Sequence, residues 1–179
     1  MAPPPLGDTL VSADRIRTRV QELVLELETQ SRRPDFILLG ILRGSFMFIA
    51  DLVRGLHMAR LHPRIDFMAL ASYGSGTESA GRVDLVHRHA TPVRNAHVLL
   101  VDDILDTGRT LSFARARLLE EGAASVATCV LLDKPARRVV PIEADHVGFT
   151  IEDLFVVGYG LDVDGYYREL PYIARLDMA

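Results

Sequence analysis

The chain has 179 residues, of which 49% are hydrophobic and 25% are charged, and its formal net charge at pH 7 is −4. These values fit a single compact domain spanning residues 1–179, and they give no global attraction to nucleic acid or to an anionic membrane. One cysteine, Cys129, excludes an internal disulfide, and no apolar run approaches the roughly 18 residues of a membrane span, so we expect a cytoplasmic protein.

The first half of the chain predicts an alternation of helices and strands. Residues 1–10, which hold three prolines, are expected to be a frayed end. Ser12 is a typical helix N-cap, and apolar residues spaced by four, three and four predict a helix after it. Those apolar residues are Ile16, Val20, Leu23 and Leu27. Next come a buried strand at 36–42, a helix at about 45–56, a strand at 65–72 and a more polar strand at 83–89.

The second half continues the pattern and ends in a strand-rich tail. The unbroken apolar run at 98–101 predicts a parallel strand covered on both faces, and a helix follows at about 111–121 with Gly122 as its C-cap. A buried strand at 126–132 contains Cys129, which we expect to be a core residue rather than a nucleophile. Shorter strands are expected at 147–149, at 155–159 and, more weakly, at 166–168.

This order of elements indicates an α/β fold. Strands that alternate with helices predict a mostly parallel sheet flanked by helices. We expect the N-terminal region and the strand-rich tail to build a small hood over the ligand-binding edge of that sheet.

Residues 98–112 carry the most informative motif. Asp102 and Asp103 fall at the end of the apolar run, where open α/β sheets bind their ligands. The segment 106–110, Asp-Thr-Gly-Arg-Thr, precedes a helix whose free N–H groups and positive dipole end suit a phosphate dianion. The two acids can accept hydrogen bonds from sugar hydroxyls or hold a metal. The segment therefore predicts a site for a sugar phosphate with Mg²⁺, and it lacks the GxxxxGK[ST] and GxGxxG motifs of nucleoside triphosphatases and dehydrogenases.

This segment resembles the phosphoribosyl-pyrophosphate-binding motif of the type I phosphoribosyltransferases. Four further segments, at 40–48, 71–77, 131–138 and 155–162, follow the order found in the 6-oxopurine phosphoribosyltransferases. The resemblance, which extends from about residue 12 to residue 176, implies the type I phosphoribosyltransferase fold. It implies Mg²⁺-dependent transfer of the 5-phosphoribosyl group from 5-phosphoribosyl 1-pyrophosphate (PRPP) to hypoxanthine or guanine, which gives IMP or GMP and pyrophosphate. It also implies a homodimer or homotetramer.

The resemblance further implies a role for each matching residue. Asp106 is expected to be the general base that takes the proton from purine N7, and Asp162 to coordinate Mg²⁺ together with Asp102 and Asp103. A cis peptide is implied between Leu42 and Arg43. The residues expected to bind PRPP are Arg43, Gly44, Ser72, Tyr73, Asp102, Asp103, Asp106, Thr107, Gly108, Arg109, Thr110 and Arg168.

The same resemblance implies the purine contacts and a lid. Lys134 would donate to the purine 6-oxygen, Phe155 would stack on the ring, and the Val156 backbone would bond the base edge. Asp162 is also expected to bind the purine. The Gly- and Ser-rich stretch at 73–81 would close over the site and exclude water.

Some residues leave alternatives open. Asp102 stands where many close relatives have Glu, which leaves its reach to the ribose undecided. His87 and His89 sit two residues apart and could bind a metal, although a solvated strand face is preferred because no third ligand is in sight. A regulator of the same fold that binds RNA or effector nucleotides is disfavoured by Asp106 and by the net charge of −4. A xanthine or uracil phosphoribosyltransferase is disfavoured by Lys134, Phe155 and the Val-Val-Gly-Tyr-Gly stretch at 156–160.

Overall fold

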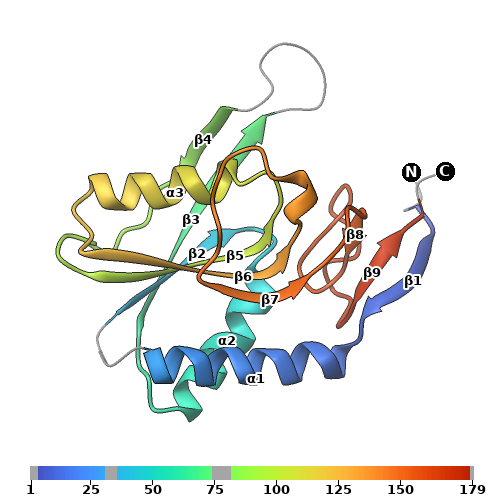
Figure 1. The fold of residues 1–179 in the computed structure, drawn as a ribbon, viewed down its shortest axis with the longest axis horizontal. Coiled ribbons are helices and arrows are strands. Elements are labelled where there is room, and N and C mark those ends of the chain that lie inside the picture. Colours follow the sequence, from blue (N-terminus) through green and yellow to red (C-terminus); the bar gives the residue numbers. More distant parts are fainter. Residues whose placement is uncertain (1–3, 31–35, 74–81, 178–179) are drawn as a thin grey trace.

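A computed structural model describes residues 4–30, 36–73 and 82–177. The main element is a six-stranded sheet in the order β4-β3-β2-β5-β6-β7, which runs through the middle of Figure 1. Neighbouring strands pair in parallel except β3 and β4, which are antiparallel. This confirms the expected α/β class. The strands are β2 (Ile37–Leu42), β3 (Arg64–Tyr73), β4 (Arg82–His87), β5 (His97–Leu105), β6 (Ser125–Asp133) and β7 (His146–Thr150).

Helices cover both faces of this sheet. In Figure 1, α1 (Ala13–Gln30) and α2 (Phe46–Met58) lie on one face and α3 (Arg109–Glu120) lies on the other. Successive residues of β5 point to opposite faces, so Leu99 and Val101 join the core beneath α1 and α2, whereas Val98 and Leu100 join the core beneath α3. The unbroken apolar run is therefore buried on both sides, as predicted.

The sequence signals of α1 and of Cys129 are confirmed. Ser12 Oγ accepts a hydrogen bond from the Arg15 N–H at 3.4 Å, as an N-cap does. The four apolar residues spaced along α1 are all buried. Cys129 is buried too, and burial raises the pKa of its thiol to about 12, so the thiol stays protonated and acts as a core residue. None of the helices in the described residues is long and apolar enough to cross a membrane.

The two ends of the described chain meet in a second, smaller sheet. Its order is β1-β9-β8, formed by β1 (Leu6–Val11), β9 (Ile173–Leu176) and β8 (Val156–Val157). Leu6 lies opposite Leu176, so the prediction of a frayed end at 1–10 is wrong from Leu6 onward. The prediction of a strand at 166–168 is also wrong, since Tyr166 makes only an isolated bridge. The strand β9 was not predicted. β1 and β9 pair although they lie far apart in the sequence, so no local sequence pattern indicates the pairing.

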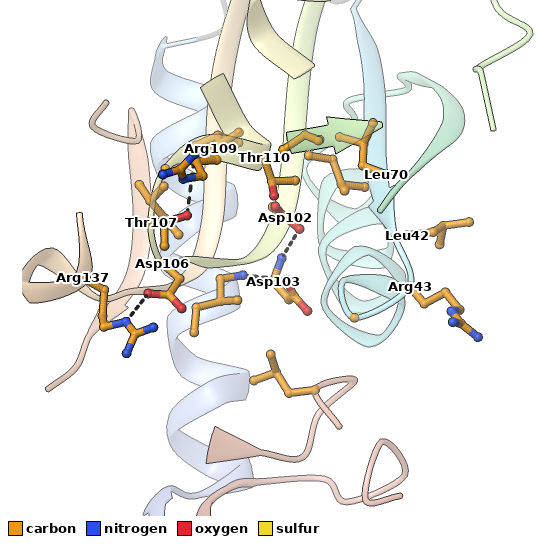
Figure 2. Close-up of a pocket in the computed structure, with 18 of the residues that line it drawn as sticks. Leu42, Arg43, Leu70, Asp102, Asp103, Asp106, Thr107, Arg109, Thr110 and Arg137 are labelled. Atoms are coloured by element: carbon orange, nitrogen blue, oxygen red, sulfur yellow. Dashed lines mark hydrogen bonds and ion pairs between the residues drawn. The ribbon is translucent and has the colours of Figure 1, made fainter. Parts of the chain in front are cut away.

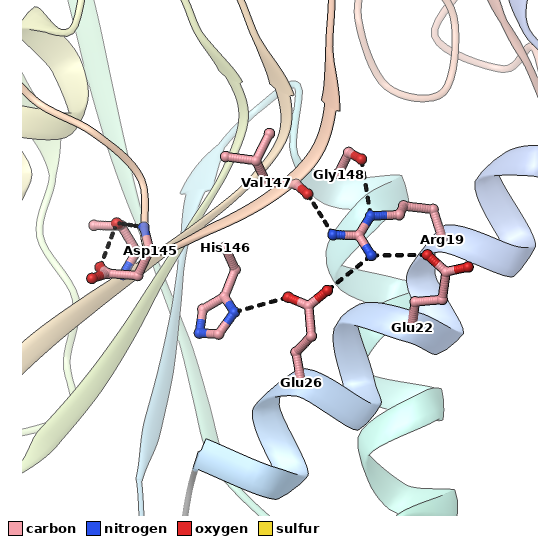
Figure 3. A network of polar contacts seen from close by, with 8 residues as sticks. Arg19, Glu22, Glu26, Asp145, His146, Val147 and Gly148 are labelled. Atoms are coloured by element: carbon pink, nitrogen blue, oxygen red, sulfur yellow. Dashed lines mark hydrogen bonds and ion pairs between the residues drawn. The ribbon is translucent and has the colours of Figure 1, made fainter.

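An ion-pair network fastens α1 to β7, the outer strand of the large sheet (Figure 3). The Arg19 guanidinium donates to the carbonyls of Gly148 at 2.9 Å and Val147 at 2.8 Å, and it pairs with Glu22 and Glu26. These bonds satisfy carbonyl groups that an edge strand would otherwise leave open to another chain.

The two histidines after β4 behave differently. His87 is exposed, but the strand ends there, and His89 is buried. The His89 ring lies 2.9 Å from the Thr91 carbonyl and 3.0 Å from the Glu121 carboxylate. The preference for a solvated strand face was therefore wrong for His89. Its partner Glu121 lies at the end of α3, so the local sequence around His89 gave no sign of the contact.

Candidate functional site

A cavity of about 650 Å³ opens at the carboxyl ends of β2 and β5 (Figure 2). This is the edge of the sheet at which ligands bind in open α/β folds. Several segments distant in sequence meet here, and the small sheet contributes its neighbouring loop. The lining residues are Ile41–Gly44, Leu70, Val83, Asp102–Leu111, Arg137, Val139, Leu161, Asp162 and Arg168.

Asp102 and Asp103 lie inside β5 rather than after it, because β5 continues to Leu105. Burial raises the pKa of the Asp102 carboxyl well above its ordinary value, and the neighbouring Asp103 charge raises it further. Burial also raises the pKa of Asp103, against hydrogen bonds from Asp102 and from the Ile104 N–H that lower it. Both buried carboxyl groups therefore hold a proton more readily than an exposed aspartate does, and a bound cation or hydroxyl donor would favour their ionised forms.

The turn after β2 lies directly against these acids. The peptide between Leu42 and Arg43 is cis, as the resemblance implied. Gly44 follows, and a Cβ built on it would lie 1.5 Å from Asp103 Oδ2, so only glycine leaves the carboxylate in place. The Arg43 side chain is exposed and lines the cavity, where it can contact an anion.

The loop between β5 and α3 has the geometry of a phosphate cradle. Gly108 has φ +85°, and a Cβ there would lie 2.8 Å from the Val140 carbonyl, so the turn requires glycine. Gly108, the N-cap of α3, makes no side-chain hydrogen bond to the first turn, and the Arg109 N–H donates to Thr107 Oγ1 at 3.5 Å. The remaining first-turn N–H groups, beside the cavity, are suited to an anion. The Thr107 carbonyl accepts hydrogen bonds from the N–H groups of Val139 and Val140, both at 3.0 Å, which hold the loop from behind.

Asp106 stands at the start of that loop and faces the cavity. Its Oδ1 is enclosed and makes no hydrogen bond among the described residues, although Arg137 Nε lies 3.3 Å away as an ion pair (Figure 2). A buried carboxylate oxygen without a hydrogen-bond donor is costly unless a ligand supplies one. Asp106 can therefore accept a proton or a hydrogen bond from a bound molecule.

The tail brings Asp162 and Arg168 to the other side of the cavity. Arg168 donates to the Gly160 carbonyl at 2.5 Å and pairs with Asp162 at 2.6 Å. The second oxygen of Asp162 accepts the Gly165 N–H at 2.7 Å. Gly160 has φ +101° and sits so close to the Gly44 carbonyl that a Cβ would lie 2.0 Å from it, which locks the tail against the turn after β2.

The residues expected to bind a purine lie beside the cavity rather than in its lining. Lys134 is buried at the end of β6, and its N–H donates to the Leu105 carbonyl at 2.9 Å, next to Asp106. Phe155 is 45% exposed, which is unusual for a phenylalanine and leaves its ring available for stacking. Val156 begins β8 and is buried. None of these three lines the 650 Å³ cavity in the part of the chain that the structure describes.

The structure describes only the backbone of Ser72 and Tyr73, and it does not describe residues 74–81. Ser72 and Tyr73 end β3, and their side chains lie outside the described part of the structure, as does most of the expected lid, residues 74–81. Within 4–30, 36–73 and 82–177, no group of three or more His, Cys, Asp or Glu side chains could hold a metal by itself. The sequence analysis assigned no role to Arg137 or Arg138, which lie a few residues after Lys134. The only signal in the sequence was the presence of two adjacent cations near the end of a strand.

Comparison with known proteins places this site in a family. The family model for the phosphoribosyl transferase domain matches residues 8–164. The chain belongs to the phosphoribosyltransferase family, and the fold class expected from the motifs is confirmed.

Within that family the chain is similar to enzymes that act on hypoxanthine and guanine. It is 45% identical to the hypoxanthine-guanine phosphoribosyltransferase of Streptococcus pneumoniae R6, over 93% of this chain and 91% of that protein. The hypoxanthine phosphoribosyltransferase of Escherichia coli K12 is 40% identical over 94% of both chains. A crystal structure of a Bacillus anthracis hypoxanthine-guanine phosphoribosyltransferase, with HEPES in its active site, aligns with a TM-score of 0.89 and 38% identity, over 96% of this chain and 99% of that one.

Proposed function

We propose that this protein transfers the 5-phosphoribosyl group of PRPP to hypoxanthine or guanine and releases pyrophosphate. The observation that carries the proposal is the single cavity that unites the paired acids of β5, the phosphate cradle before α3, and the arginines Arg43 and Arg168. The similarity to hypoxanthine-guanine phosphoribosyltransferases along nearly the whole chain supports the same reaction.

The residues that line the cavity account for each part of PRPP. The N–H groups around Gly108 bind the 5′-phosphate, and the carboxylates of Asp102 and Asp103 accept hydrogen bonds from the ribose hydroxyls. Arg43 and Arg168, which line the cavity from two different segments, bind the pyrophosphate. Ser72 and Tyr73, at the end of β3, also bind the pyrophosphate in this proposal.

The carboxylates fit Mg²⁺, which usually takes few protein ligands and fills the rest of its shell with water and phosphate oxygens. Asp162, with Asp102 and Asp103, would hold it, and the bound ion would offset the charge of the departing pyrophosphate. Both oxygens of Asp162 have protein partners in this structure, Arg168 and the Gly165 N–H, so a metal at Asp162 would share the carboxylate with Arg168 or displace it.

The purine is placed by the segments next to the cavity. Lys134 donates to the 6-oxygen, which favours hypoxanthine and guanine over adenine because the adenine 6-amino group is itself a donor. The exposed ring of Phe155 stacks on the base, and the Val156 backbone bonds its edge.

Asp106 is the general base in this proposal. As purine N9 attacks the ribose carbon, N7 becomes acidic and must lose its proton for a neutral base to remain. The enclosed Oδ1 of Asp106, which has no hydrogen-bond donor among the described residues, accepts that proton.

An assay with four bases tests the proposal. PRPP and Mg²⁺ are supplied with hypoxanthine, guanine, xanthine or uracil, and the nucleoside monophosphate and pyrophosphate are quantified. We expect turnover with hypoxanthine and guanine at least about tenfold above turnover with xanthine and uracil, a ratio comparable to the value of one hydrogen bond. Preferred turnover of xanthine or uracil would reassign the substrate, and no turnover with any base would favour a regulator that binds nucleotides or RNA.

We also propose that the protein is a homodimer or homotetramer. The proposal is supported by the Trypanosoma cruzi hypoxanthine phosphoribosyl transferase, whose C-terminal region has been studied for its role in the oligomeric state of that enzyme. Its structure is 37% identical to this chain, with a TM-score of 0.89 over 96% of this chain and 91% of that one. Sedimentation equilibrium tests the proposal, since a mass of one chain, 19.8 kDa, at micromolar concentration would contradict it.

A further inference from the structure

Two consecutive arginines behind Lys134 have opposite environments. Arg137, at the end of the short helix Pro135–Arg137, is half exposed and lines the cavity, where it pairs with Asp106. The Arg138 side chain is only 16% exposed and does not line the cavity. Arg138 therefore does not touch a molecule that fills the cavity, and its contacts are with the protein wall behind it.

Arg138 joins the ends of the two strands that lead to the proposed base and to the proposed purine donor. Its Nη1 donates to the carbonyl of Leu105 at 3.0 Å and to the carbonyl of Asp106, and its Nη2 donates to the Asp133 carboxylate. Leu105 ends β5 and Asp133 ends β6, and the two residues are paired in the sheet. One guanidinium thus joins the end of β5, which is followed by Asp106, to the end of β6, which is followed by Lys134.

The same side chain supports the phosphate cradle. A Cβ on Gly108 would lie 3.1 Å from Arg138 Cδ, so the Arg138 methylene groups form a floor directly under that turn. The next two residues, Val139 and Val140, donate their N–H groups to the Thr107 carbonyl. The hydrogen bonds and packing of Arg138 thus reach the backbone of Asp106, the end of β6 and the cradle together.

We propose that Arg138 is a positioning residue that fixes the Asp106 carboxylate relative to the purine held by Lys134. The inference rests on the proposed function. A rigid, planar guanidinium can bond two carbonyls and a carboxylate in fixed directions, whereas a lysine ammonium is a point charge that cannot span all three. Misplacement of a catalytic group by about 1 Å can cost about 10² in rate.

A purely structural role predicts a different result, and Arg19 provides the matched control (Figure 3). Like Arg138, Arg19 donates to two backbone carbonyls and pairs with carboxylates, and its side chain is 22% exposed. It does not line the cavity. The substitutions R138K and R19K therefore remove similar interactions, one beside the proposed base and one far from it.

The test compares kcat, the KM values and the thermal midpoint of the wild type, R138K, R19K, D106N and R138K/D106N. We expect R138K to lower kcat by about 10–100-fold with little change in the KM for PRPP, and R19K to keep the wild-type kcat at a similar loss of thermal midpoint. Because Arg138 acts through Asp106, its effect on kcat should vanish in the D106N background.

Other results overturn the inference. A wild-type kcat in R138K, or the same fold-loss with and without D106N, would make Arg138 a structural residue only, and full turnover in D106N would remove the group through which it acts. If R138K fails to fold, D133A carries the test, because it removes the acceptor that orients Nη2 and leaves both carbonyl contacts. An unchanged kcat in D133A would again refute the proposal. Absence of turnover in the wild type refutes the proposed function instead, so the two failures are distinguishable.

Discussion

The contact between Gly44 and Asp103 supports a prediction with a magnitude that follows from the structure. A Cβ at position 44 would lie 1.5 Å from Asp103 Oδ2 and 2.6 Å from Cγ. To reach ordinary van der Waals contact the carboxylate must retreat by about 2 Å. Since a displacement of about 1 Å can cost about 10² in rate, we expect Gly44→Ala to lower kcat/KM for PRPP by at least about 10²-fold.

Folding should tolerate the same change. The carboxylate is the end of a rotatable side chain, so the structural loss is limited to its hydrogen bond from the Ile104 N–H, worth about 1 kcal/mol. Initial rates at varied PRPP, together with thermal unfolding, separate the two effects. Gly122→Ala is the control, because Gly122 has φ +92° at the end of α3, where alanine costs about 1 kcal/mol of stability but should leave kcat/KM unchanged. A Gly44→Ala variant with wild-type kcat/KM would show that the position of Asp103 does not matter to PRPP.

Four further substitutions have distinct expected outcomes. Arg43→Ala should weaken PRPP and pyrophosphate binding but spare the nucleoside monophosphate, and equal losses in calorimetric titrations would remove Arg43 from the pyrophosphate site. Lys134→Ala should raise the KM for hypoxanthine by roughly one to two orders of magnitude and change the KM for PRPP less, so an unchanged hypoxanthine KM would contradict its role as donor. Asp106→Asn should lower kcat by about 10²–10⁴-fold with PRPP binding and the thermal midpoint nearly unchanged, whereas near-normal turnover would exclude it as the base. Because burial and Asp103 raise the pKa of Asp102, the folded protein binds this proton more tightly than the unfolded chain, so stability falls as pH rises from the ordinary aspartate range through the raised pKa. Asp102→Asn should make that decline smaller in the ligand-free protein, and a wild-type slope of thermal midpoint against pH in the variant would refute this origin.

The parts of the fold that the sequence predicted are those with strong local patterns. The apolar run at 98–101, the spacing of apolar residues along α1 and the segment 106–110 each specify their own structure within a few residues. The position of the cavity followed from the rule that parallel strands present their carboxyl ends to ligands.

The parts that were not predicted depend on contacts between distant residues. β1 and β9 exist because they pair with each other, with Leu6 opposite Leu176, and neither carries a strong strand pattern alone. β5 passes beyond the expected end because Leu105 still pairs with Asp133 on β6. The role of Arg138 was not predicted, because its contacts join Leu105, Asp106 and Asp133, which lie at two different strand ends.

The most direct test of the proposed function is the stoichiometry of one reaction. Purified protein, PRPP, Mg²⁺ and hypoxanthine are mixed, and IMP and pyrophosphate are quantified over the same time course. The proposed reaction predicts the two products in equal amounts, at a rate that depends on the presence of both substrates. Release of pyrophosphate without IMP, or no release of either product, would contradict transfer of the phosphoribosyl group to the purine.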